Sequence, residues 1–356
     1  MDDLKYKKAF QGKKILITGG LGFIGSNLAI KLSELEPERI LIIDSLIPEC
    51  GGNEKNIEEI KDKVEVLKID IRNQTGVDVL IRGFIPDYIF NMTGILSHVA
   101  SLEDPKRDAE INAWATYNIL EPCRKSGHNV KIIYAGTRGQ YGKDHGPEPI
   151  TEKNSTLRPA DPNGISKNAG EQACLFYNDV FPNINAVSLR MTNTYGPRHQ
   201  MRNRYQGFLN WFIKLAMDGE EITVYEPGRQ LRDFNYIEDV VDALLKVAVS
   251  EKTNGEVYNL GSCINIGGNV TELGGGVISV KEVAEKIVRI SNELTGKNAV
   301  LKMIPYPEEK KKVEVGDIKM DITKIYNDTG WKPQTELEIG LRKTIEFYKK
   351  NKDKYW

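Results

Sequence analysis

Residues 14–28 read KILITGGLGFIGSNL, and the pattern of this stretch decides the fold of the region around it. The apolar run at 15–17 predicts a buried parallel strand, and a helical apolar pattern follows the glycines. Between strand and helix, Gly19, Gly22 and Gly25 follow one another at three-residue intervals. A strand, a glycine turn and a helix in this order are typical of a site for the pyrophosphate of a dinucleotide.

Each of the three glycines has its own physical reason. Gly19 permits the tight turn, Gly22 lets a pyrophosphate approach the backbone, and Gly25 lets the helix lie close to the strand. The helix N-terminus offers free N–H groups and a positive dipole end to the phosphates.

A second apolar run, at residues 39–44, ends in an acid, Asp44. This acid lies about 20 residues beyond the glycines, where a carboxylate accepts hydrogen bonds from a ribose 2′-hydroxyl and repels a 2′-phosphate. The expected cofactor is therefore NAD and not NADP. The alternative is that Asp44 only caps a loop.

Length and composition restrict the class of protein. A chain of 356 residues holds one large domain or two modest ones, and a formal net charge of −1 gives no reason to expect nucleic acid or anionic lipid as a partner. No apolar run approaches the ~20 residues of a membrane helix, and the first residues, MDDLK, begin no signal peptide. The four cysteines are scattered and only four histidines are present, so we expect reduced thiols, a cytoplasmic location and no metal site.

Strands and helices alternate along the first 190 residues, which predicts an α/β fold with a doubly wound parallel sheet. Past residue 190 the pattern loosens, and the Gly-rich segment 261–276 is expected to form an extended loop or a hairpin. We expect a nucleotide-binding domain over 1–190 and a smaller cap over 191–356, with some chain around 230–260 returning to the first domain. Further expected strands are 64–70, 87–91, 130–135, 185–190, 222–225 and 257–260; expected helices are 105–125, 165–181, 207–217, 240–249, 279–294 and 336–350.

Motifs spread over nearly the whole chain resemble the extended short-chain dehydrogenase/reductases that act on nucleotide sugars, a group of epimerases, dehydratases and decarboxylases. The resemblance implies a Rossmann-type doubly wound parallel sheet with a smaller C-terminal α/β substrate-binding cap. The matching residues are 18–25, Asp44, Asp70, Ile71, Asn112, Thr137, 141–142, 166–167, 190–197, 231–234, Asp239 and 330–333.

The resemblance also implies the chemistry and the cofactor site. NAD takes a hydride from the sugar and gives it back later in the same cycle. Asp70 and Ile71 lie by the adenine in the family, and Thr93 is expected to hydrogen-bond the cofactor. The residues expected to bind NAD are Gly19, Gly22, Phe23, Ile24, Gly25, Asp44, Asp70, Ile71, Thr93, Asn112 and Lys167.

The catalytic signature departs from the family at one position. In the family a Tyr stands four residues before a Lys and removes the proton of the sugar hydroxyl, with a Ser or Thr upstream. Here the Lys is Lys167 and the upstream residue is Thr137, but Asn163 occupies the Tyr position. An amide does not accept a proton near neutral pH, and general base catalysis is typically worth ~10²–10⁴-fold.

Three explanations of Asn163 stay open. Another group takes the proton, namely Lys167 with a lowered pKa, Tyr141 or His98. Alternatively, Asn163 holds a water that relays the proton, or the chain binds its ligands and catalyses poorly. The expected catalytic residues are Thr137, Lys167, Asn163 and Tyr141.

We expect arginines opposite the diphosphate of the substrate, because guanidinium groups bind phosphates in a bidentate way. Arg232 is the best candidate by its motif, and Asn193 is expected near the diphosphate or sugar. Arg198 forms a local basic cluster with Arg202 and Arg204, which either covers the cleft or is solvated. Arg138 and Gln140 either bind a carboxylate or hydroxyl of the sugar or face solvent. Tyr236 either belongs to the core or contacts the substrate. The expected substrate-binding residues are Asn193, Arg198, Arg232, Arg138 and Tyr236.

The leading expectation is an NAD-dependent nucleotide-sugar epimerase, most simply a UDP-sugar 4-epimerase. One alternative is a nucleotide-sugar 4,6-dehydratase, but such enzymes usually carry an Asp-Glu pair directly after the catalytic Ser or Thr, where this chain has Arg138 and Gly139. The other is a catalytically weak NAD and nucleotide-sugar binding protein. The resemblance also implies a homodimer formed by the helices 105–125 and 165–181. Apolar residues for that interface, or else for the core, are Ala115, Leu120, Leu175 and Phe176.

Overall fold

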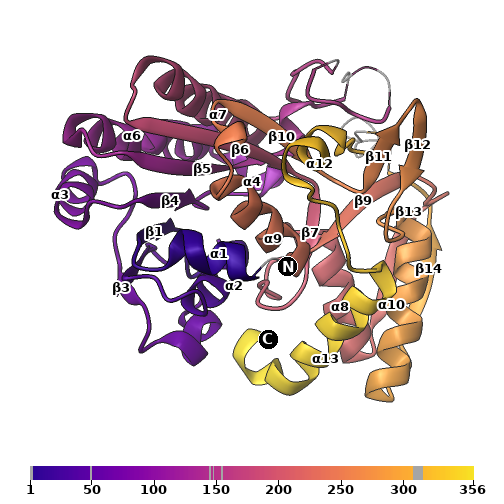
Figure 1. The fold of residues 1–356 in the computed structure, drawn as a ribbon. Helices are drawn as coiled ribbons and strands as arrows, with labels where there is room; N and C mark the ends of the chain where they lie inside the picture. Colours follow the sequence, from indigo (N-terminus) through magenta and orange to yellow (C-terminus); the bar gives the residue numbers. More distant parts are fainter. Residues whose placement is uncertain (1–2, 49, 144–145, 147, 154, 308–315) are drawn as a thin grey trace.

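The computed structural model describes residues 3–48, 50–143, 146, 148–153, 155–307 and 316–356 of the chain. At its centre is a seven-stranded parallel sheet in the order β10-β6-β5-β4-β1-β2-β3 (Figure 1). This is the predicted doubly wound sheet. The strands are β1 (Lys14–Thr18), β2 (Arg39–Ile43), β3 (Glu65–Leu67), β4 (Tyr88–Asn91), β5 (Val130–Thr137), β6 (Ile184–Met191) and β10 (Glu256–Leu260).

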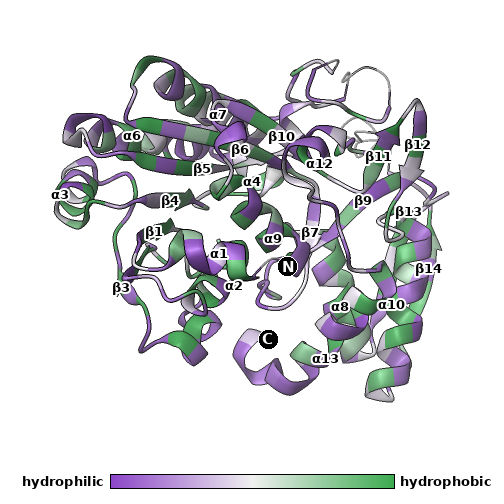
Figure 2. Ribbon diagram, in the orientation of Figure 1, coloured by the Kyte–Doolittle hydropathy of each residue, from purple (hydrophilic) through white to green (hydrophobic). Residues whose placement is uncertain are grey.

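Helices cover both faces of this sheet, which is why its strands are apolar on both sides. In β1, Ile15 and Ile17 belong to the core on one face, and Leu16 belongs to the core on the other. Figure 2 shows the central strands as largely hydrophobic. The helices α1 (Asp3–Phe10), α2 (Phe23–Ser33) and α9 (Ile237–Ala248) lie on the first face, and α3 (Gln74–Phe84), α6 (Ala115–Ser126) and α7 (Pro162–Val180) on the second.

The helix predicted over 105–125 is interrupted by one π-helical turn. It consists of α5 (Pro105–Ala109), the π turn η2 (Glu110–Trp114) and α6, and it follows α4 (His98–Glu103). Single π turns inside α-helices are frequent at functional sites. This one holds Asn112, whose amide bonds the backbone of Ile95 through both of its polar atoms.

The C-terminal half is built from small sheets and longer helices, and its strand β10 returns to the central sheet. The segment 261–276 contains a hairpin, one of its two predicted forms. The strands are β7 (Asn193–Tyr195), β8 (Glu221–Tyr225), β9 (Leu231–Tyr236), β11 (Cys263–Ile266), β12 (Asn269–Glu272), β13 (Val277–Ser279) and β14 (Val300–Ile304). The helices are α8 (Phe208–Asp218), α10 (Val280–Thr295), α12 (Thr323–Thr329) and α13 (Leu337–Tyr355), and the short 3-10 turns of the chain are η1 (Glu54–Ile60), η3 (Arg138–Gln140) and η4 (Glu251–Thr253).

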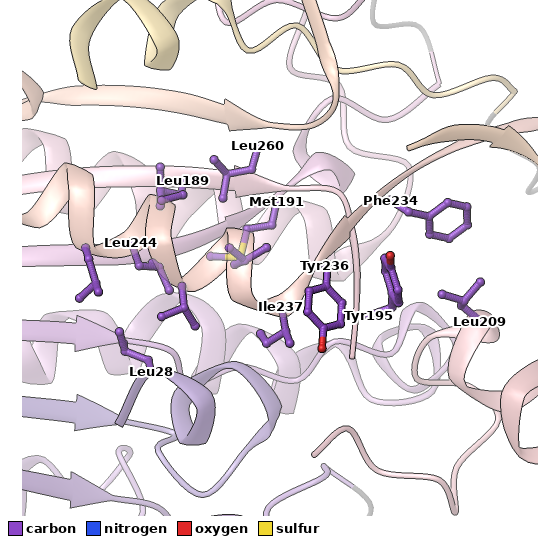
Figure 3. Close-up of a cluster of buried hydrophobic side chains, with 14 of the residues drawn as sticks. Leu28, Leu189, Met191, Tyr195, Leu209, Phe234, Tyr236, Ile237, Leu244 and Leu260 are labelled. Atoms are coloured by element: carbon purple, nitrogen blue, oxygen red, sulfur yellow. The ribbon is translucent and has the colours of Figure 1, made fainter. Parts of the chain in front are cut away.

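One hydrophobic core joins the central sheet to the C-terminal half. Figure 3 shows it running from Leu28 of α2, past Leu189 of β6, to Tyr195 and Tyr236. Tyr236 is 2% exposed, and the centroid of its ring lies 5.5 Å from that of Tyr195. Tyr236 is therefore a core residue, and its predicted contact with substrate is corrected. Among the described residues, no helix combines the length and the apolar character that crossing a bilayer requires.

Candidate active site

A cleft of about 890 Å³ lies at the carboxyl ends of the central strands. Residues at the ends of several strands line it, among them Gly19 after β1, Asp44 after β2, Thr93 after β4, Thr137 at the end of β5 and Asn193 after β6. The strand order reverses between β1 and β4, and crevices at such a reversal are where open α/β sheets bind ligands.

The glycine turn fits the pyrophosphate of a dinucleotide. Gly19 has a φ of +66°, and a Cβ added to it would lie 2.9 Å from the carbonyl oxygen of Met92, so the turns after β1 and β4 meet too closely for a side chain. Gly22 precedes α2 without a side-chain cap, so the first N–H groups of that helix face no capping side chain. Phe23, Ile24 and Gly25 also line the cleft.

Asp44 lines the cleft and also caps backbone, while its predicted hydrogen bond to a ribose stays a prediction. Its Oδ1 accepts from the N–H of Leu46 at 2.9 Å and its Oδ2 from that of Leu21 at 3.1 Å. Burial raises the pKa of Asp44, while the backbone donors lower it. Asp70 and Ile71 line the cleft as well, and the guanidinium of Arg72 lowers the pKa of Asp70.

Lys167 is a buried amine in the wall of the cleft. It is 1% exposed, and its Nζ donates to the carbonyl oxygens of Thr93 at 3.2 Å and Ala135 at 3.1 Å. Burial lowers the pKa of Lys167 to about 8, although the nearby Asp108 carboxylate raises it. A lysine with this pKa is partly neutral near physiological pH, and in that form it accepts a proton.

Asn163 lies in the first turn of α7 and lines the same cleft. Its Nδ2 donates to the carbonyl oxygen of Ile95 and, at 3.1 Å, to Oδ2 of Asp108. Asp108 is 1% exposed, and its Oδ1 has no hydrogen-bond partner among the described residues. The residue four positions before Lys167 is thus tied to a buried carboxylate. Asn112 bonds the same Ile95 and is not among the described residues that line the cleft, so the structure gives no support to its predicted contact with NAD.

Thr137 and Tyr141 differ in where they point. Thr137 lines the cleft, and its Oγ1 accepts from the N–H of Gly139 at 3.2 Å. Tyr141 is fully buried and outside the described lining; its hydroxyl donates to Asn259 at 2.7 Å and accepts from Arg190 at 2.8 Å. Burial raises the pKa of Tyr141 to about 12. The predicted catalytic role of Tyr141 is therefore corrected to a structural one.

The predicted substrate residues fall into two groups. Arg232, Asn193 and Arg138 line the cleft, and Nη1 of Arg232 donates to the carbonyl oxygens of Leu231 and Gly316 at 2.8 and 2.7 Å. Arg198 is not part of the described lining. Its guanidinium instead pairs with the carboxylate of Glu59 and with the side chain of Asn27, so its predicted substrate contact is corrected. Of the other two arginines in that cluster, only Arg204 lines the cleft. The side chain of His98 lies outside the described part of the structure.

Comparison with known proteins identifies the family. Residues 15–261 match the model of the "NAD dependent epimerase/dehydratase family". The chain belongs to this family. A UDP-N-acetyl-alpha-D-glucosaminuronate decarboxylase of Bacillus cytotoxicus is 30% identical over 342 residues, which are 95% of this chain and 98% of that protein. A CDP-paratose 2-epimerase of Salmonella typhi is 28% identical, over 94% of this chain and 98% of that one.

A solved structure has the same fold. The UDP-glucose 4-epimerase of Thermotoga maritima, with UDP-glucose, is 28% identical and superposes with a TM-score of 0.80 over 95% of this chain and 99% of that chain. NAD is thus the cofactor of this epimerase/dehydratase family member, as the glycine turn and Asp44 predict. The relatives carry out different reactions on nucleotide sugars, so the family alone does not fix the reaction.

Sequence reasoning missed several polar residues of this family member's cleft. Asn210 on α8 is 1% exposed, and its Oδ1 has no hydrogen-bond partner among the described residues. His199 lies with its ring 4.8 Å from Phe23, and burial lowers its pKa to about 4. One signal was present in the sequence, since Asn210 interrupts the apolar stripe of its helix. Asp108, which bonds Asn163 but is not among the described lining residues, was also missed.

Proposed function

We propose that the chain is an NAD-dependent nucleotide-sugar epimerase, most simply a UDP-sugar 4-epimerase. The observation that carries this proposal is the presence of Lys167 and Thr137 in one cleft with the glycine turn. NAD, when bound, takes a hydride from a sugar carbon and returns it to the keto-sugar. Arg232 and Asn193 line the same cleft and supply donors for a diphosphate.

The proton of the sugar hydroxyl goes to Nζ of Lys167 in this proposal. The pKa of Lys167 is about 8, whereas Tyr141 is held away from the cleft and the amide of Asn163 does not titrate. Thr137 lies beside these groups and holds the hydroxyl by a hydrogen bond. The same Lys167 returns the proton once the keto group has been reduced.

The two residues directly after Thr137 favour epimerisation over elimination of water. A 4,6-dehydration needs an additional acid and base next to the sugar. In this chain the two residues directly after Thr137 are Arg138 and Gly139, and neither is an acid. A glycine has no side chain to protonate a leaving hydroxyl. An arginine stays protonated at working pH, so it neither gives up nor accepts a proton during an elimination.

We also propose a homodimer formed through η2, α6 and α7. Trp114 and Phe176 are 67% and 57% exposed there, with Tyr117 of α6 close to Trp114. Ala115 and Leu120, expected either at this interface or in the core, are buried in the core. Light scattering of the purified protein tests this: we expect a dimer for the native chain and a monomer for Trp114→Glu combined with Phe176→Glu.

Proton NMR of the protein with NAD in D₂O tests the proposed reaction. The panel is UDP-glucose, UDP-galactose, UDP-N-acetylglucosamine, UDP-glucuronate and dTDP-glucose. We expect a sugar to change into its 4-epimer with no deuterium on carbon, because the hydride leaves and returns at one centre. A 4-keto-6-deoxy product with carbon-bound deuterium contradicts epimerisation and indicates dehydration. Bound NAD with no change in any sugar indicates a binding protein.

A further inference from the structure

The outer loop, residues 197–207 between β7 and α8, lies across the cofactor end of the cleft. The centroid of the His199 ring is 4.8 Å from that of Phe23, the first residue of α2 after the glycine turn. On the other side, a Cβ added to Gly51, in the connection after β2, would lie 3.3 Å from Cγ of Gln200. The residues of the loop that line the cleft are 199, 200 and 204–207. The loop therefore lies against both segments that are expected to bind NAD.

Arg198 ties the start of this loop to two other elements. Its Nε donates to the carbonyl oxygen of Asn56 at 3.2 Å, and its Nη1 donates to Oδ1 of Asn27 at 3.1 Å. Its Nη2 pairs with the carboxylate of Glu59. Asn27 lies in α2, which follows the glycine turn, and the other two partners lie in η1. One guanidinium, whose side chain is 17% exposed, thus joins the outer loop to the helix that begins the cofactor site.

The backbone of Arg198 is strained. Its φ is +72°, a conformation that costs free energy in residues with a side chain. Such a residue persists only where its surroundings hold it, and residues of this kind cluster at ligand clamps. The main chain beside it is held as well. Nδ2 of Asn27 donates to the carbonyl oxygen of Pro197 at 3.1 Å. The hydroxyl of Tyr348 donates to the carbonyl oxygen of His199 at 2.7 Å.

His199, the next residue along the loop, lines the cleft with a neutral ring. Burial lowers the pKa of His199 to about 4. Its Nδ1 lies 2.8 Å from the carbonyl oxygen of Gln200, and because a carbonyl oxygen only accepts, Nδ1 carries the hydrogen and Nε2 is an acceptor. A Cβ added to Gly207, the last residue of the loop, would lie 3.3 Å from Nε2. His199 therefore joins the two ends of the loop by packing and adds no charge to the cleft.

We infer that Arg198 is a positioning residue for the cofactor: it holds the outer loop against the start of α2, and the loop slows the release of NAD. This inference rests on the cofactor of the family and not on the proposed reaction. A wall that a bound molecule must pass acts on its dissociation, and affinity differences among variants of one site lie mostly in the dissociation rate. An Arg198 that served stability alone would leave that rate unchanged.

The test is a chase experiment on the whole protein. The protein is loaded with radiolabelled NAD and diluted into excess unlabelled NAD, and the label that stays bound is followed over time. Arg198→Gln should raise the dissociation rate at least about tenfold, the usual order for losing hydrogen bonds to a charged group. The Kd for NAD, measured by calorimetry on protein freed of cofactor, should rise by the same factor, because the association rate is not lowered.

A second variant keeps the backbone of the loop while removing the side chain. Arg198→Gly loses the guanidinium, but glycine adopts a positive φ without strain, so this variant should fold even if Arg198→Gln does not. It should release NAD as fast as Arg198→Gln. The matched control is Arg342→Gln in α13. Arg342 donates to both carboxylate oxygens of Glu293, at 2.8 and 2.7 Å, and is not among the described lining residues. The control should change the dissociation rate by less than about twofold.

The outcomes separate a role in holding NAD from a role in stability. Faster release in the variants of Arg198, with the native rate in Arg342→Gln, supports the inference. A native rate of release in Arg198→Gly, an equal rise in Arg342→Gln, or a higher Kd that arises from slower association overturns it. None of these results decides the proposed reaction, because the NMR experiment on the native protein tests that separately.

Discussion

At the glycine end of the cleft the binding surface is backbone, whereas at the Lys167 end it is made of buried side chains. Gly19 and Gly22 line the cleft with backbone alone, and a side chain at Gly19 would meet Met92. Around Lys167, the side chains of Asn163 and Asp108 are held by one another at 3.1 Å although they are 55 residues apart. The glycine motif itself lies within one short stretch of sequence, whereas the side chains at the Lys167 end meet only in the folded chain.

The two ends should therefore fail in different ways. At the glycine end, any added Cβ weakens cofactor binding. At the Lys167 end, the charge and the pKa of single groups decide the rate, while cofactor binding changes less.

Replacing Lys167 should have the largest effect. We expect Lys167→Met to lower kcat by about 10³-fold, since removal of a general base typically costs ~10²–10⁴-fold. Turnover of the sugar by NMR gives kcat, and circular dichroism checks the fold.

The matched control is Lys131→Met. Lys131 is also a buried lysine, but it lies in β5 and is not among the described residues that line the cleft. Burial lowers the pKa of Lys131 to about 7, and its Nζ donates to Thr253 at 3.0 Å. This variant should lose thermal stability and keep its kcat. A comparable loss of kcat in both variants would show that the effect of Lys167 is structural.

Adding one methyl group at Gly19 should be the next largest effect. Gly19→Ala forces a side chain into a positive φ, which costs about 1–2 kcal/mol, and pushes on the carbonyl of Met92. We expect the Kd for NAD to rise at least about tenfold, as measured by calorimetry on protein freed of cofactor.

Gly83→Ala in α3 is the control for Gly19→Ala, because nothing lies within 4 Å of a Cβ added there. It should bind NAD normally and gain up to about 1 kcal/mol of stability from helix propensity. Unchanged NAD affinity in Gly19→Ala would contradict the placement of the pyrophosphate.

Removing the charge of Asp108 should shift the pH dependence by a smaller amount. Asp108 raises the pKa of Lys167, so Asp108→Asn should lower that pKa further and move the acidic limb of kcat to lower pH, by less than about one unit. The new amide can still accept from Asn163. A shift to higher pH, or none, would separate Asp108 from Lys167.

Placing at position 163 the tyrosine that the resemblance leads us to expect should have the smallest effect. Asn163→Tyr places a phenol next to the buried Asp108, and a neighbouring carboxylate disfavours the phenolate. We therefore expect kcat no higher than that of the native protein. A variant at least about tenfold faster would mean that the native chain lacks an efficient base.

Much of the fold can be predicted from the sequence because its signals are local. The apolar runs of β1 and β2 and the glycine turn between them predict the sheet, the cofactor and the place of the cleft. The charged helix α1 was missed because it buries only Tyr6 and Phe10. The π turn at Asn112 could not be predicted, because the apolar residues of that segment keep an ordinary helical spacing.

The reacting end is less predictable, since the behaviour of its groups is set by distant partners. Lys167 can be found from the sequence, but its lowered pKa comes from its burial in the folded chain. The direction of Tyr141 is set by Arg190 and Asn259, far along the chain. The ion pair of Arg198 with Glu59 likewise appears only in the folded chain.

The pH dependence of kcat for the native protein tests the central claim, that Lys167 takes the proton of the sugar hydroxyl. The charged form of Lys167 predominates below a pH of about 8 and cannot accept a proton. We therefore predict that kcat rises about tenfold per pH unit up to that value and is level above it. A kcat that stays constant from about pH 6 to 9, or that rises only near the ordinary lysine value of about 10.4, would contradict the claim.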